Sequence, residues 1–445
     1  MQKSQNRHRF FNSFRIIVLG FAGVILAGAL LLMLPISSAE RVVTPFIDTL
    51  FTSTTAVCVT GLVVRDTGTY WSIFGQSVIL ILIQIGGLGV ITVAAAFAMI
   101  AGRKIGLMQR STMQEAVAAP KMSGIVRLTG FVIRTTLVIE LIGAAVMAPV
   151  FCRDFGIPRG IWMSVFHSVS AFCNAGIDVM GVRGEYSSLT TYADNPVINI
   201  TIMLLIIIGG IGFLTWDDIR TNRHHIRHYR MQSKVILTVT ALLILVPAVF
   251  FFFADFGSLP LGERILSSLF QSVTPRTAGF NTVDLTAMTS ASQAIVIILM
   301  LIGGSPGSTA GGMKTTTFAV LLSSAFSVFR RKDDAGFFGR RIEAGAVKNA
   351  ATILIMYVTL FFTGAVIISV YEGLPMSECL YETASAVGTV GLTLGITPGL
   401  GALSQCVLIL LMFFGRVGGL TLIYAAISDA HKNLSKLPQE KITVG

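Results

Sequence analysis

The chain has 445 residues, of which 53% are hydrophobic and only 12% are charged, and its mean hydropathy is +0.77. This composition lies far outside that of soluble domains and indicates an integral membrane protein. The formal net charge is +11, but the basic residues gather in a few connections between apolar segments. That pattern is typical of a membrane topology signal facing anionic lipid, and we expect no nucleic-acid partner.

Eight apolar runs are long enough to cross the hydrocarbon core of a bilayer, which takes about 20 helical residues. They lie near residues 16–34, 76–101, 128–150, 197–216, 235–254, 293–327, 349–370 and 402–427. We therefore predict an all-α integral membrane protein with eight transmembrane helices. None of these runs carries the pattern of a cleavable signal peptide.

Lysine and arginine cluster before the first run and in the connections at 103–127, 220–234 and 330–348. By the positive-inside rule, these connections and both termini are predicted to lie in the cytoplasm, in a multi-pass protein of the cell membrane. The odd-numbered connections then face outward, and they carry acidic residues such as Asp66 and Asp178. An acidic outer mouth raises the local concentration of cations.

Each outward-facing connection holds one copy of a repeated stretch. The copies are FTSTTAVCVTG at 51–61, FHSVSAFCNAG at 166–176, FQSVTPRTAG at 270–279 and YETASAVGTVG at 381–391. In each copy an aromatic residue is followed four positions later by a hydroxyl residue, and the copy ends in glycine. The copies recur about once in each quarter of the chain, which indicates internal repeats.

We predict four repeats, each made of a span, a pore loop and a span, with pseudo-fourfold symmetry around a central pore. The third repeat has a broken second span. The predicted units are 1–103, 104–222, 223–332 and 333–427, followed by a cytoplasmic tail at 428–445.

The glycine-ended half of each copy is predicted to line the pore, because irregular backbone at membrane depth is tolerated only in protein or beside a water-filled cavity. A half-helix entering from outside points its negative C-terminal end at the middle of the membrane. The glycine lets the chain turn so that successive carbonyls face one axis, where rings of carbonyls can replace the hydration shell of a monovalent cation. The predicted ion-binding residues, acting mainly through backbone carbonyls, are Cys58, Val59, Thr60, Gly61, Cys173, Asn174, Ala175, Gly176, Arg276, Thr277, Ala278, Gly279, Gly388, Thr389, Val390 and Gly391.

A glycine cluster occurs in the second helix of every repeat. Close helix packing in lipid explains IGGLG at 85–89 and IGGIG at 208–212. The third cluster extends into GGSPGSTAGGMKTTT at 303–317, which a continuous helix would not tolerate. We predict an intramembrane loop beneath the carbonyl ring, acting as a gate. Its residues are Gly303, Gly304, Ser305, Pro306, Gly307, Ser308, Thr309, Ala310, Gly311 and Gly312.

Three basic residues are expected near the ring and the loop. Lys314 is predicted at or below the floor of the cavity. Arg416, in the fourth cluster GRVGG, is predicted to contact the loop because a charge in a span should face the cavity. The alternative for Arg416 is a structural arginine tied to neighbouring carbonyls. Arg276 is predicted to brace the ring from behind, against Glu382 or Glu378.

These features resemble the potassium-translocating membrane subunits of the Trk/Ktr/HKT superfamily. The resemblance is carried by the four repeats, TPRTAGF at 274–280, GTVGLT at 388–393, the break in the sixth span and Arg416. It covers nearly the whole chain. The first repeat is not preceded by extra spans, which is closer to Ktr subunits (KtrB and KtrD) than to Trk subunits.

The resemblance implies potassium as the substrate, driven inward by the membrane potential, and leaves open whether sodium is coupled or regulatory. Potassium at the filter is the only metal it implies, and no cofactor bound by this chain. It implies a homodimer with one pore per protomer and a cytosolic ring of nucleotide-binding RCK subunits, KtrA-like, that controls the loop. It also implies that Gly61 favours potassium over sodium. Cys58 and Cys173 stand where we expect threonine or asparagine in the family.

Two other functions are alternatives to potassium uptake. One is a sodium-coupled cation symporter of the same fold. The other is an intramembrane hydrolase using Ser305 or Ser308 with His167. The hydrolase is disfavoured because His167 is expected at the outer end of its pore helix and the serines at or below mid-membrane. We therefore expect no catalytic residues and no enzyme activity, and the five cysteines, which form no CxxC pair, are expected to be free thiols.

Overall fold

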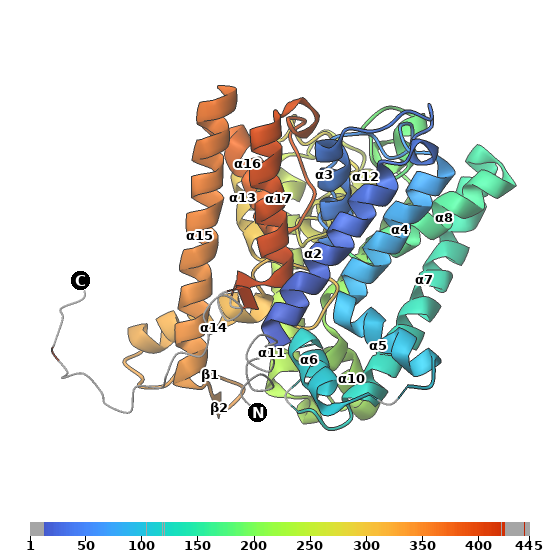
Figure 1. The fold of residues 1–445 in the computed structure, drawn as a ribbon. Coiled ribbons are helices and arrows are strands. Elements are labelled where there is room, and N and C mark those ends of the chain that lie inside the picture. The colour runs from blue at the N-terminus through green and yellow to red at the C-terminus, as the bar shows by residue number, and fades with distance from the viewer. Residues whose placement is uncertain are drawn as a thin grey trace.

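The protein is described by a computed structural model that covers residues 13–103, 105–117, 119, 121–419, 421–422 and 440 (Figure 1). The predicted cytoplasmic N-terminal segment before residue 13, and all of the predicted tail 428–445 except residue 440, lie outside the described residues. Within them the chain is mainly helical, as predicted. One antiparallel hairpin is present, formed by β1 (Gly336–Phe337) and β2 (Arg340–Arg341).

The helices recur in one order along the chain: a long helix, then a short helix, then a helix in the place of the predicted second span. This third helix, called the second helix of its repeat below, ends at or next to a glycine cluster. The long helices are α2 (Ser13–Leu32), α7 (Ile125–Phe155), α11 (Met231–Ala254) and α15 (Ala344–Glu372). The short helices are α3 (Phe46–Val57), α8 (Ile157–Phe172), α12 (Leu261–Val273) and α16 (Met376–Gly388). The second helices are α4 (Ile73–Leu88), α9 (Pro196–Gly210), α13 (Ser290–Leu301) and α17 (Ala402–Val417).

The remaining helices are α5 (Val90–Ile100), α6 (Leu107–Val117), α10 (Phe213–Asn222) and α14 (Thr315–Phe329). They gather at the lower end of the molecule in Figure 1, whereas the short helices lie in its upper part. The described part of the chain also contains five 3₁₀ turns: η1 (Pro35–Ser37), η2 (Met180–Val182), η3 (Thr190–Tyr192), η4 (Ile226–His228) and η5 (Thr397–Gly399).

The four long helices are each long and apolar enough to cross a membrane. The bent pairs α4 with α5 and α9 with α10 also qualify if each pair is one span, whereas α13, α14 and α17 are shorter apolar helices. Leu19, Phe253 and Val370, on three of the long helices, are 63%, 73% and 81% exposed. Apolar side chains that are this exposed on long helices are typical of a surface that contacts lipid. The count of eight spans and the repeat boundaries stay predictions.

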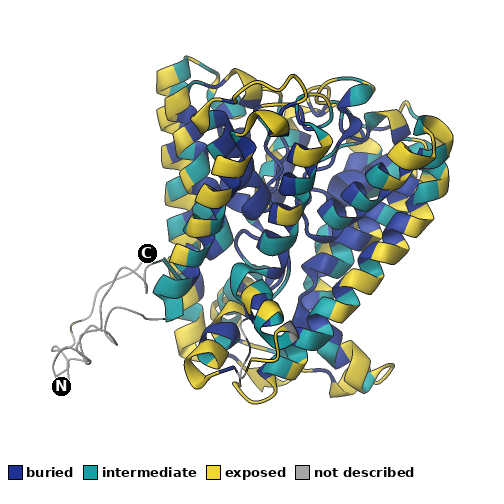
Figure 2. Ribbon diagram, turned by 45° about the vertical axis from the view of Figure 1, so that its right-hand side comes forward, coloured by how far each residue is buried: buried dark blue, intermediate teal, exposed yellow. Residues whose placement is uncertain are grey.

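A proline lies at the N-terminus of each short helix. Pro45, Pro260 and Pro375 each precede the first residue of α3, α12 and α16, and Pro158 is the second residue of α8. Proline is tolerated there because its fixed φ suits a helix and the first N–H groups of a helix lack internal partners. Each short helix packs against the long helix that precedes it. Buried residues gather in the middle of the molecule, between these helices (Figure 2).

Three of the predicted continuous spans are interrupted, and in the one predicted at 402–427 the helix α17 ends at Val417, before Gly418 with a φ of +86°. The span predicted at 76–101 is α4 followed by α5, bent by 96°, and the span predicted at 197–216 is α9 followed by α10, bent by 95°. The two bends fall at Gly89 and Gly212, whose φ angles are +87° and +91°. Residues with a side chain rarely adopt this conformation, so the last glycine of each cluster ends the helix.

The first glycine of each cluster serves close packing, as predicted. A Cβ added at Gly86 or Gly209 would fall on the backbone carbonyl of Val57 or Phe172, the last residues of α3 and α8. The prediction that close packing alone explains these clusters is therefore wrong. The same motif both admits the end of the short helix and breaks the second helix below it.

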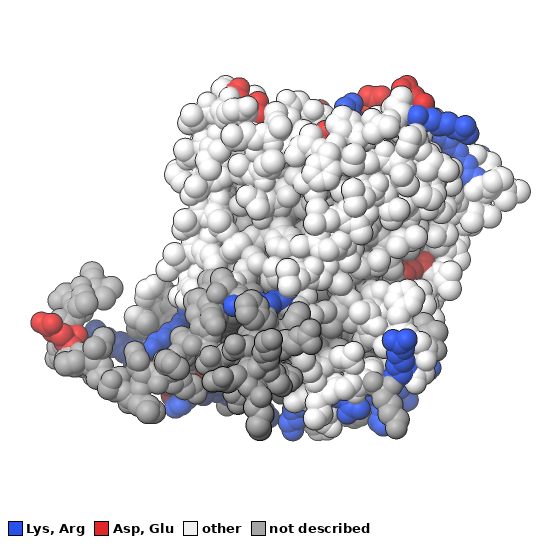
Figure 3. All heavy atoms as spheres, in the orientation of Figure 1, with Lys and Arg blue, Asp and Glu red and all other residues white. Residues whose placement is uncertain are grey.

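Charged atoms are distributed unevenly over the face seen in Figure 3. A wide middle band is almost free of them. Carboxylates and some basic groups gather along the upper edge, and lysine and arginine predominate along the lower edge. This is the surface expected of a membrane-embedded protein.

Candidate ion pathway

The four repeated stretches share one backbone conformation after their short helices. The residue two positions before each closing glycine has a positive φ: Val59 (51°), Asn174 (58°), Thr277 (67°) and Thr389 (52°). The closing glycines have positive φ as well: Gly61 (101°), Gly176 (62°), Gly279 (81°) and Gly391 (96°). Asparagine adopts a positive φ more readily than most residues, but valine and threonine rarely do. Val59, Thr277 and Thr389 therefore hold an uncommon conformation, which is tolerated where the surrounding structure enforces it.

The hydroxyl residue predicted in each copy holds this turn in place. Thr55 and Ser385 accept hydrogen bonds from the backbone N–H groups of Gly61 and Gly391, at 3.0 and 2.9 Å. Ser170 donates to the carbonyl of Ile177 at 2.6 Å, and the hydroxyl of Thr274 donates to the carbonyl of Phe280. All four bonds tie the end of the short helix to the backbone at or just beyond the closing glycine.

The third copy is one residue shorter than the others, and its turn absorbs the difference. In the first copy the N–H of Thr60 donates to the carbonyl of Thr55, five residues earlier, and the second and fourth copies repeat this spacing. In the third copy the N–H of Ala278 donates to the carbonyl of Thr274, four residues earlier. The closing glycine consequently reaches the same position in all four copies.

The closing glycines meet one another around a common centre. All four line a single cavity of about 130 Å³ on the side of the loops that follow them. A Cβ added at Gly61 would lie 2.6 Å from the carbonyl oxygen of Ala175. The corresponding contacts are Gly176 with the carbonyl of Ala278, Gly279 with that of Val390, and Gly391 with that of Thr60, all closer than 3.0 Å.

These contacts run from each copy to the next and return to the first, so they form a closed ring. The four carbonyl groups that take part belong to the residue just before the closing glycine in every copy. The added Cβ of Gly61 would also lie 3.2 Å from the Cα of Gly391 and 3.3 Å from that of Gly176. Any side chain at these positions would meet the backbone of a neighbouring turn, so these positions favour glycine.

All sixteen residues predicted to bind ions are buried and lie in these four turns. Their side chains differ in direction. Cys58 and Cys173 follow the last residues of α3 and α8. The thiol of Cys173 lies 3.6 Å from Gln84 Oε1 and 3.9 Å from Glu140 Oε1, so it faces the helices behind the ring. This thiol therefore does not line the pathway.

The hydroxyl groups of Thr60 and Thr389 are buried and have no hydrogen-bond partner among the described residues. Such groups are uncommon in folded proteins because their desolvation costs free energy. A Cβ added at Gly311 would fall on Thr389 Oγ1, so this hydroxyl faces the predicted gate loop. Both hydroxyl oxygens could coordinate a dehydrated cation.

Arg276 lies behind the ring, as predicted, but its partner is different. Its guanidinium donates to Thr240 Oγ1 of α11 at 3.1 Å, and no ion pair joins it to Glu378 or Glu382 among the described residues. Glu382 instead accepts hydrogen bonds from Thr393 (2.7 Å) and Thr397, in the chain that leaves the fourth copy. The expected pairing with an acidic residue is therefore wrong.

The cavity lined by the four closing glycines, here called the outer cavity because its loops are predicted to face outward, also contains two carboxylates. Asp66 accepts hydrogen bonds at 2.9 Å from the backbone and hydroxyl of Thr69 and from the backbone of Tyr186. Asp178 accepts one at 2.9 Å from the backbone of Met180. Burial, together with the smaller effect of the nearby Asp66 charge, raises the pKa of the Asp178 carboxyl to about 7, although the hydrogen bond from Met180 opposes this shift. Asp178 lies two residues after the second closing glycine and lines the same cavity, so its charge lies at the entrance of the ring.

The predicted gate loop lies directly beneath the ring, between α13 and α14. A Cβ added at Gly312 would lie 2.8 Å from the carbonyl of Gly388, at the end of α16. The single hydroxyl hydrogen of Thr309 is shared between two acceptors, Asn174 Oδ1 at 2.9 Å and the carbonyl of Phe172 at 3.1 Å. The loop therefore contacts the inner ends of the second and fourth copies. All of its residues are buried except Pro306, Gly307 and Ser308, which are half-buried.

Backbone hydrogen bonds attach the loop to the glycine clusters of other repeats. The N–H of Ser305 donates to the carbonyl of Gly210 at 3.0 Å, and the N–H of Gly312 donates to the carbonyl of Gly415 at 3.1 Å. The N–H of Phe213, the first residue of α10, donates to the carbonyl of Gly307 at 2.7 Å. Sequence reasoning did not anticipate these contacts, although the shared GG pattern marked the residues that make them.

Arg416 makes the expected contact with the loop and also joins it to the first repeat. Its guanidinium donates to the carbonyls of Thr309, Gly86 and Gly87, the last at 3.0 Å. Lys314 donates to the carbonyls of Ala310 and Gly311, at 2.8 and 3.2 Å. Five carbonyl groups in the irregular backbone and at the end of α4 thus accept hydrogen bonds from two cations.

The serines and the histidine of the hydrolase alternative do not meet. Ser308 donates to the carbonyl of Ser305 at 2.7 Å, and the hydroxyl of Ser305 lies 3.1 Å from that of Thr315. His167 is buried in α8, where its Nδ1 lies 2.8 Å from the carbonyl of Met163. Activation of a serine requires a base within hydrogen-bond reach, which this arrangement does not provide.

Comparison with known proteins gives one consistent result. Residues 1–436 match the family described as TrkH, cation transport protein. The chain is 40% identical to the potassium/sodium uptake protein NtpJ of Enterococcus hirae, over 97% of each chain. It is 36% identical to the Ktr system potassium uptake protein B of Bacillus subtilis, over 97% of this chain and 96% of the relative. The crystal structure of the potassium transporter TrkH from Vibrio parahaemolyticus has the same fold, with a TM-score of 0.73, 20% identity, and coverage of 93% of this chain and 84% of that one.

Proposed function

Because the chain belongs to the TrkH family of cation transport proteins and is a transporter rather than an enzyme, we propose that it takes up potassium through the ring of backbone carbonyls. The relative at 40% identity is named as a potassium/sodium uptake protein, and the one at 36% identity as a potassium uptake protein. The proposed filter is made of the four turns that end at Gly61, Gly176, Gly279 and Gly391.

The closed ring of contacts between these glycines and the preceding carbonyls is the observation that carries the proposal. Carbonyl oxygens from four directions can replace the water around a monovalent cation. The C-terminal ends of α3, α8, α12 and α16 lie immediately before the ring. Each helix end contributes roughly half a negative charge, which stabilises a cation at the centre.

The membrane potential supplies the driving force. It is worth about 2.3 kcal/mol per charge per 100 mV, enough to accumulate a monovalent cation about fiftyfold. We place the acidic outer cavity outside the cell and the basic lower edge of Figure 3 in the cytoplasm, with both termini on that side. Eight spans in four pseudosymmetric repeats would then surround the pore.

The loop at 303–312 is proposed to close the pathway under the ring, and Arg416 to hold it closed. Its contacts with the inner ends of two copies support this role. We propose that the protein is a homodimer and that a cytosolic ring of nucleotide-binding RCK subunits controls the loop. The relatives named as parts of a Ktr system support a separate regulatory subunit.

Uptake into proteoliposomes tests the proposal. The purified chain is reconstituted, an inward-directed potential is set, and accumulation of rubidium, a potassium substitute, is followed. We expect uptake that scales with the potential and is inhibited by added potassium. Uptake that is absent, or that occurs without a potential or gradient, would contradict the proposed function.

Sodium coupling is a second candidate, because the name of the relative at 40% identity includes sodium. The same assay separates the two functions. Potassium uptake that requires sodium inside or outside the vesicle, with sodium moving alongside, indicates a symporter. Potassium uptake at zero sodium indicates a channel-like pathway.

A further inference from the structure

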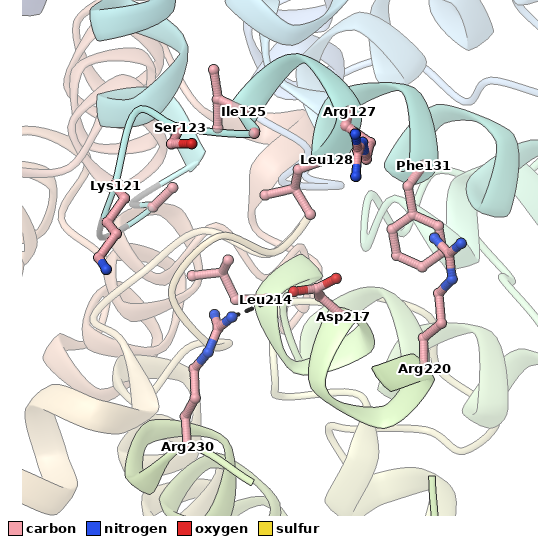
Figure 4. Close-up of a pocket in the computed structure, with 12 residues that line it drawn as sticks. Lys121, Ser123, Ile125, Arg127, Leu128, Phe131, Leu214, Asp217, Arg220 and Arg230 are labelled. Atoms are coloured by element: carbon pink, nitrogen blue, oxygen red, sulfur yellow. Dashed lines mark hydrogen bonds and ion pairs between the residues drawn. The ribbon is translucent and has the colours of Figure 1, made fainter. Parts of the chain in front are cut away.

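A cavity lined by basic residues lies on the same side of the molecule as α5, α6 and α10, apart from the proposed pathway. Its volume is about 410 Å³, and it lies between the start of α7, the helix α10 and the residue that precedes α11 (Figure 4). Four basic side chains from these segments line it: Lys121, Arg127, Arg220 and Arg230. Asp217 is the one acidic residue among the described lining residues.

Only one of the four basic side chains, that of Arg230, forms ion pairs with acidic residues of the described chain. Arg230 pairs with Asp217 and Asp218, each at 3.4 Å. The guanidinium of Arg220 lies over the ring of Phe131, 4.7 Å from its centre. Among the described residues, Lys121, Arg127 and Arg220 form no ion pair. Cations without anionic partners repel one another, so the cavity favours an anion from outside the chain.

The backbone adds donors to the same cavity. Gly124 and Ile125, at the N-terminus of the 31-residue helix α7, line it, and no side chain caps this end, although the N–H of Ile125 already makes a long bond of 3.4 Å to the carbonyl of Met122. The first N–H groups of a helix have no internal partners and carry a partial positive charge. Phosphate groups bind at such helix ends in many proteins. The backbone N–H donors and the basic side chains therefore both favour a phosphate group as the ligand.

The apolar part of the cavity distinguishes a lipid from a soluble phosphate. Leu128, Phe131 and Leu214 line it together with the cations. The 31 residues of α7 span roughly 46 Å, which exceeds the roughly 30 Å thickness of the hydrocarbon core. The first turns of α7 thus reach the level of the lipid headgroups. An amphipathic ligand can place its phosphate on the cations and the root of its chains on the leucines and the phenylalanine.

We infer that this cavity binds the headgroup of an anionic phospholipid of the inner leaflet. The bound lipid would hold α10 to the start of α7. Leu214 lines the cavity, and the preceding residue, Phe213, donates its N–H to Gly307 of the loop at 2.7 Å. Lipid at this site therefore stabilises the position of α10 against the loop. This effect on the loop rests on the proposed function, whereas the binding itself does not.

Binding is tested on the purified full-length chain by native mass spectrometry with phosphatidylglycerol, phosphatidylcholine and inorganic phosphate. The test variant combines Lys121→Gln, Arg127→Gln and Arg220→Gln and leaves the pair between Arg230 and Asp217 intact. The control variant combines Arg330→Gln, Arg331→Gln and Lys332→Gln, which removes the same charge from an exposed segment after α14. Each cation near a lipid phosphate contributes about fivefold in affinity.

We expect the wild-type chain and the control to prefer phosphatidylglycerol over phosphatidylcholine at one saturable site, and the test variant to bind it at least about tenfold more weakly. Equal binding of the two lipids, or unchanged binding by the test variant, overturns the inference. Displacement of the lipid by millimolar inorganic phosphate assigns the site to a soluble anion and overturns the lipid assignment.

Rubidium uptake into vesicles with and without phosphatidylglycerol then tests the link to the loop. We expect the lipid to change the uptake rate of the wild-type chain and of the control but not of the test variant. Lost lipid binding with an unchanged lipid effect on uptake overturns the link alone. Absence of uptake in all vesicles counts against the proposed function and leaves the binding result standing.

Discussion

Replacing Arg416 by glutamine should open the pathway. The guanidinium holds three carbonyl groups, and only the carbonyl of Thr309 belongs to the loop, while those of Gly86 and Gly87 belong to the first repeat. A hydrogen bond to a charged group contributes about 1.5–3 kcal/mol. Losing the one bond that reaches the loop therefore shifts the balance between closed and open loop by roughly 10- to 150-fold.

The expected increase in uptake is limited by two features. Backbone bonds from Ser305 to Gly210 and from Gly312 to Gly415 remain in the variant and continue to hold the loop. The rate also cannot exceed that of a fully open pathway. We therefore expect rubidium uptake into proteoliposomes to rise about tenfold or more if the wild-type loop is mostly closed.

Two variants control this experiment. Arg416→Lys keeps the charge but replaces the forked guanidinium by a single ammonium group, so we expect an intermediate rate. Arg134→Gln removes a cation from an exposed position on α7, which no described bond links to the loop, and should leave the rate unchanged. Unchanged or slower uptake by folded Arg416→Gln protein would refute the role of Arg416 as a latch.

Three further predictions concern the ring, the loop and the outer cavity. Gly61→Ser should lower the preference for potassium over sodium at least several-fold, because the serine side chain would meet the carbonyl of Ala175. Gly23→Ser, at an open site in α2, should leave this preference unchanged. Equal potassium-to-sodium discrimination by the Gly61→Ser and wild-type proteins in competitive flux assays would count against the ring. Deletion of residues 305–310 should give faster uptake that no longer responds to regulation, and equal or slower flux would remove the loop's claim to be a gate. Asp178 is ionised above its pKa of about 7 and neutral below it, so lowering the outer pH from 8 to 6 should reduce uptake at low potassium by about threefold, and Asp178→Asn should abolish this dependence; a pH response that persists in the variant would exclude Asp178 as its source.

The members of the ring could be predicted from the sequence because their constraint is local. A helix with a hydroxyl residue close to its C-terminal end, followed within a few positions by a glycine, needs only these neighbouring residues to define its turn. The same spacing four times identified Gly61, Gly176, Gly279 and Gly391, and the structure places them around one cavity. The loop at 303–312 was equally visible, because proline and several glycines exclude a helix there.

The bends at Gly89 and Gly212 could not be predicted, because the same glycine motif also satisfies close packing. The partner of Arg276 was mispredicted for a related reason. A count of charges favours Glu378 or Glu382, but the side chain reaches Thr240 because of the way α11 packs against α12, which only the folded chain reveals. The link between Thr309 and Asn174 likewise joins residues that are 135 positions apart.

Thallium is a heavy substitute for potassium, and its anomalous diffraction from crystals of the protein tests the ring most directly. We predict thallium peaks on the axis enclosed by the carbonyls of Thr60, Ala175, Ala278 and Val390, at the level of the four closing glycines. The peaks should weaken when potassium is added. Thallium bound only elsewhere on the protein, with no peak inside this ring, would contradict the proposed pathway.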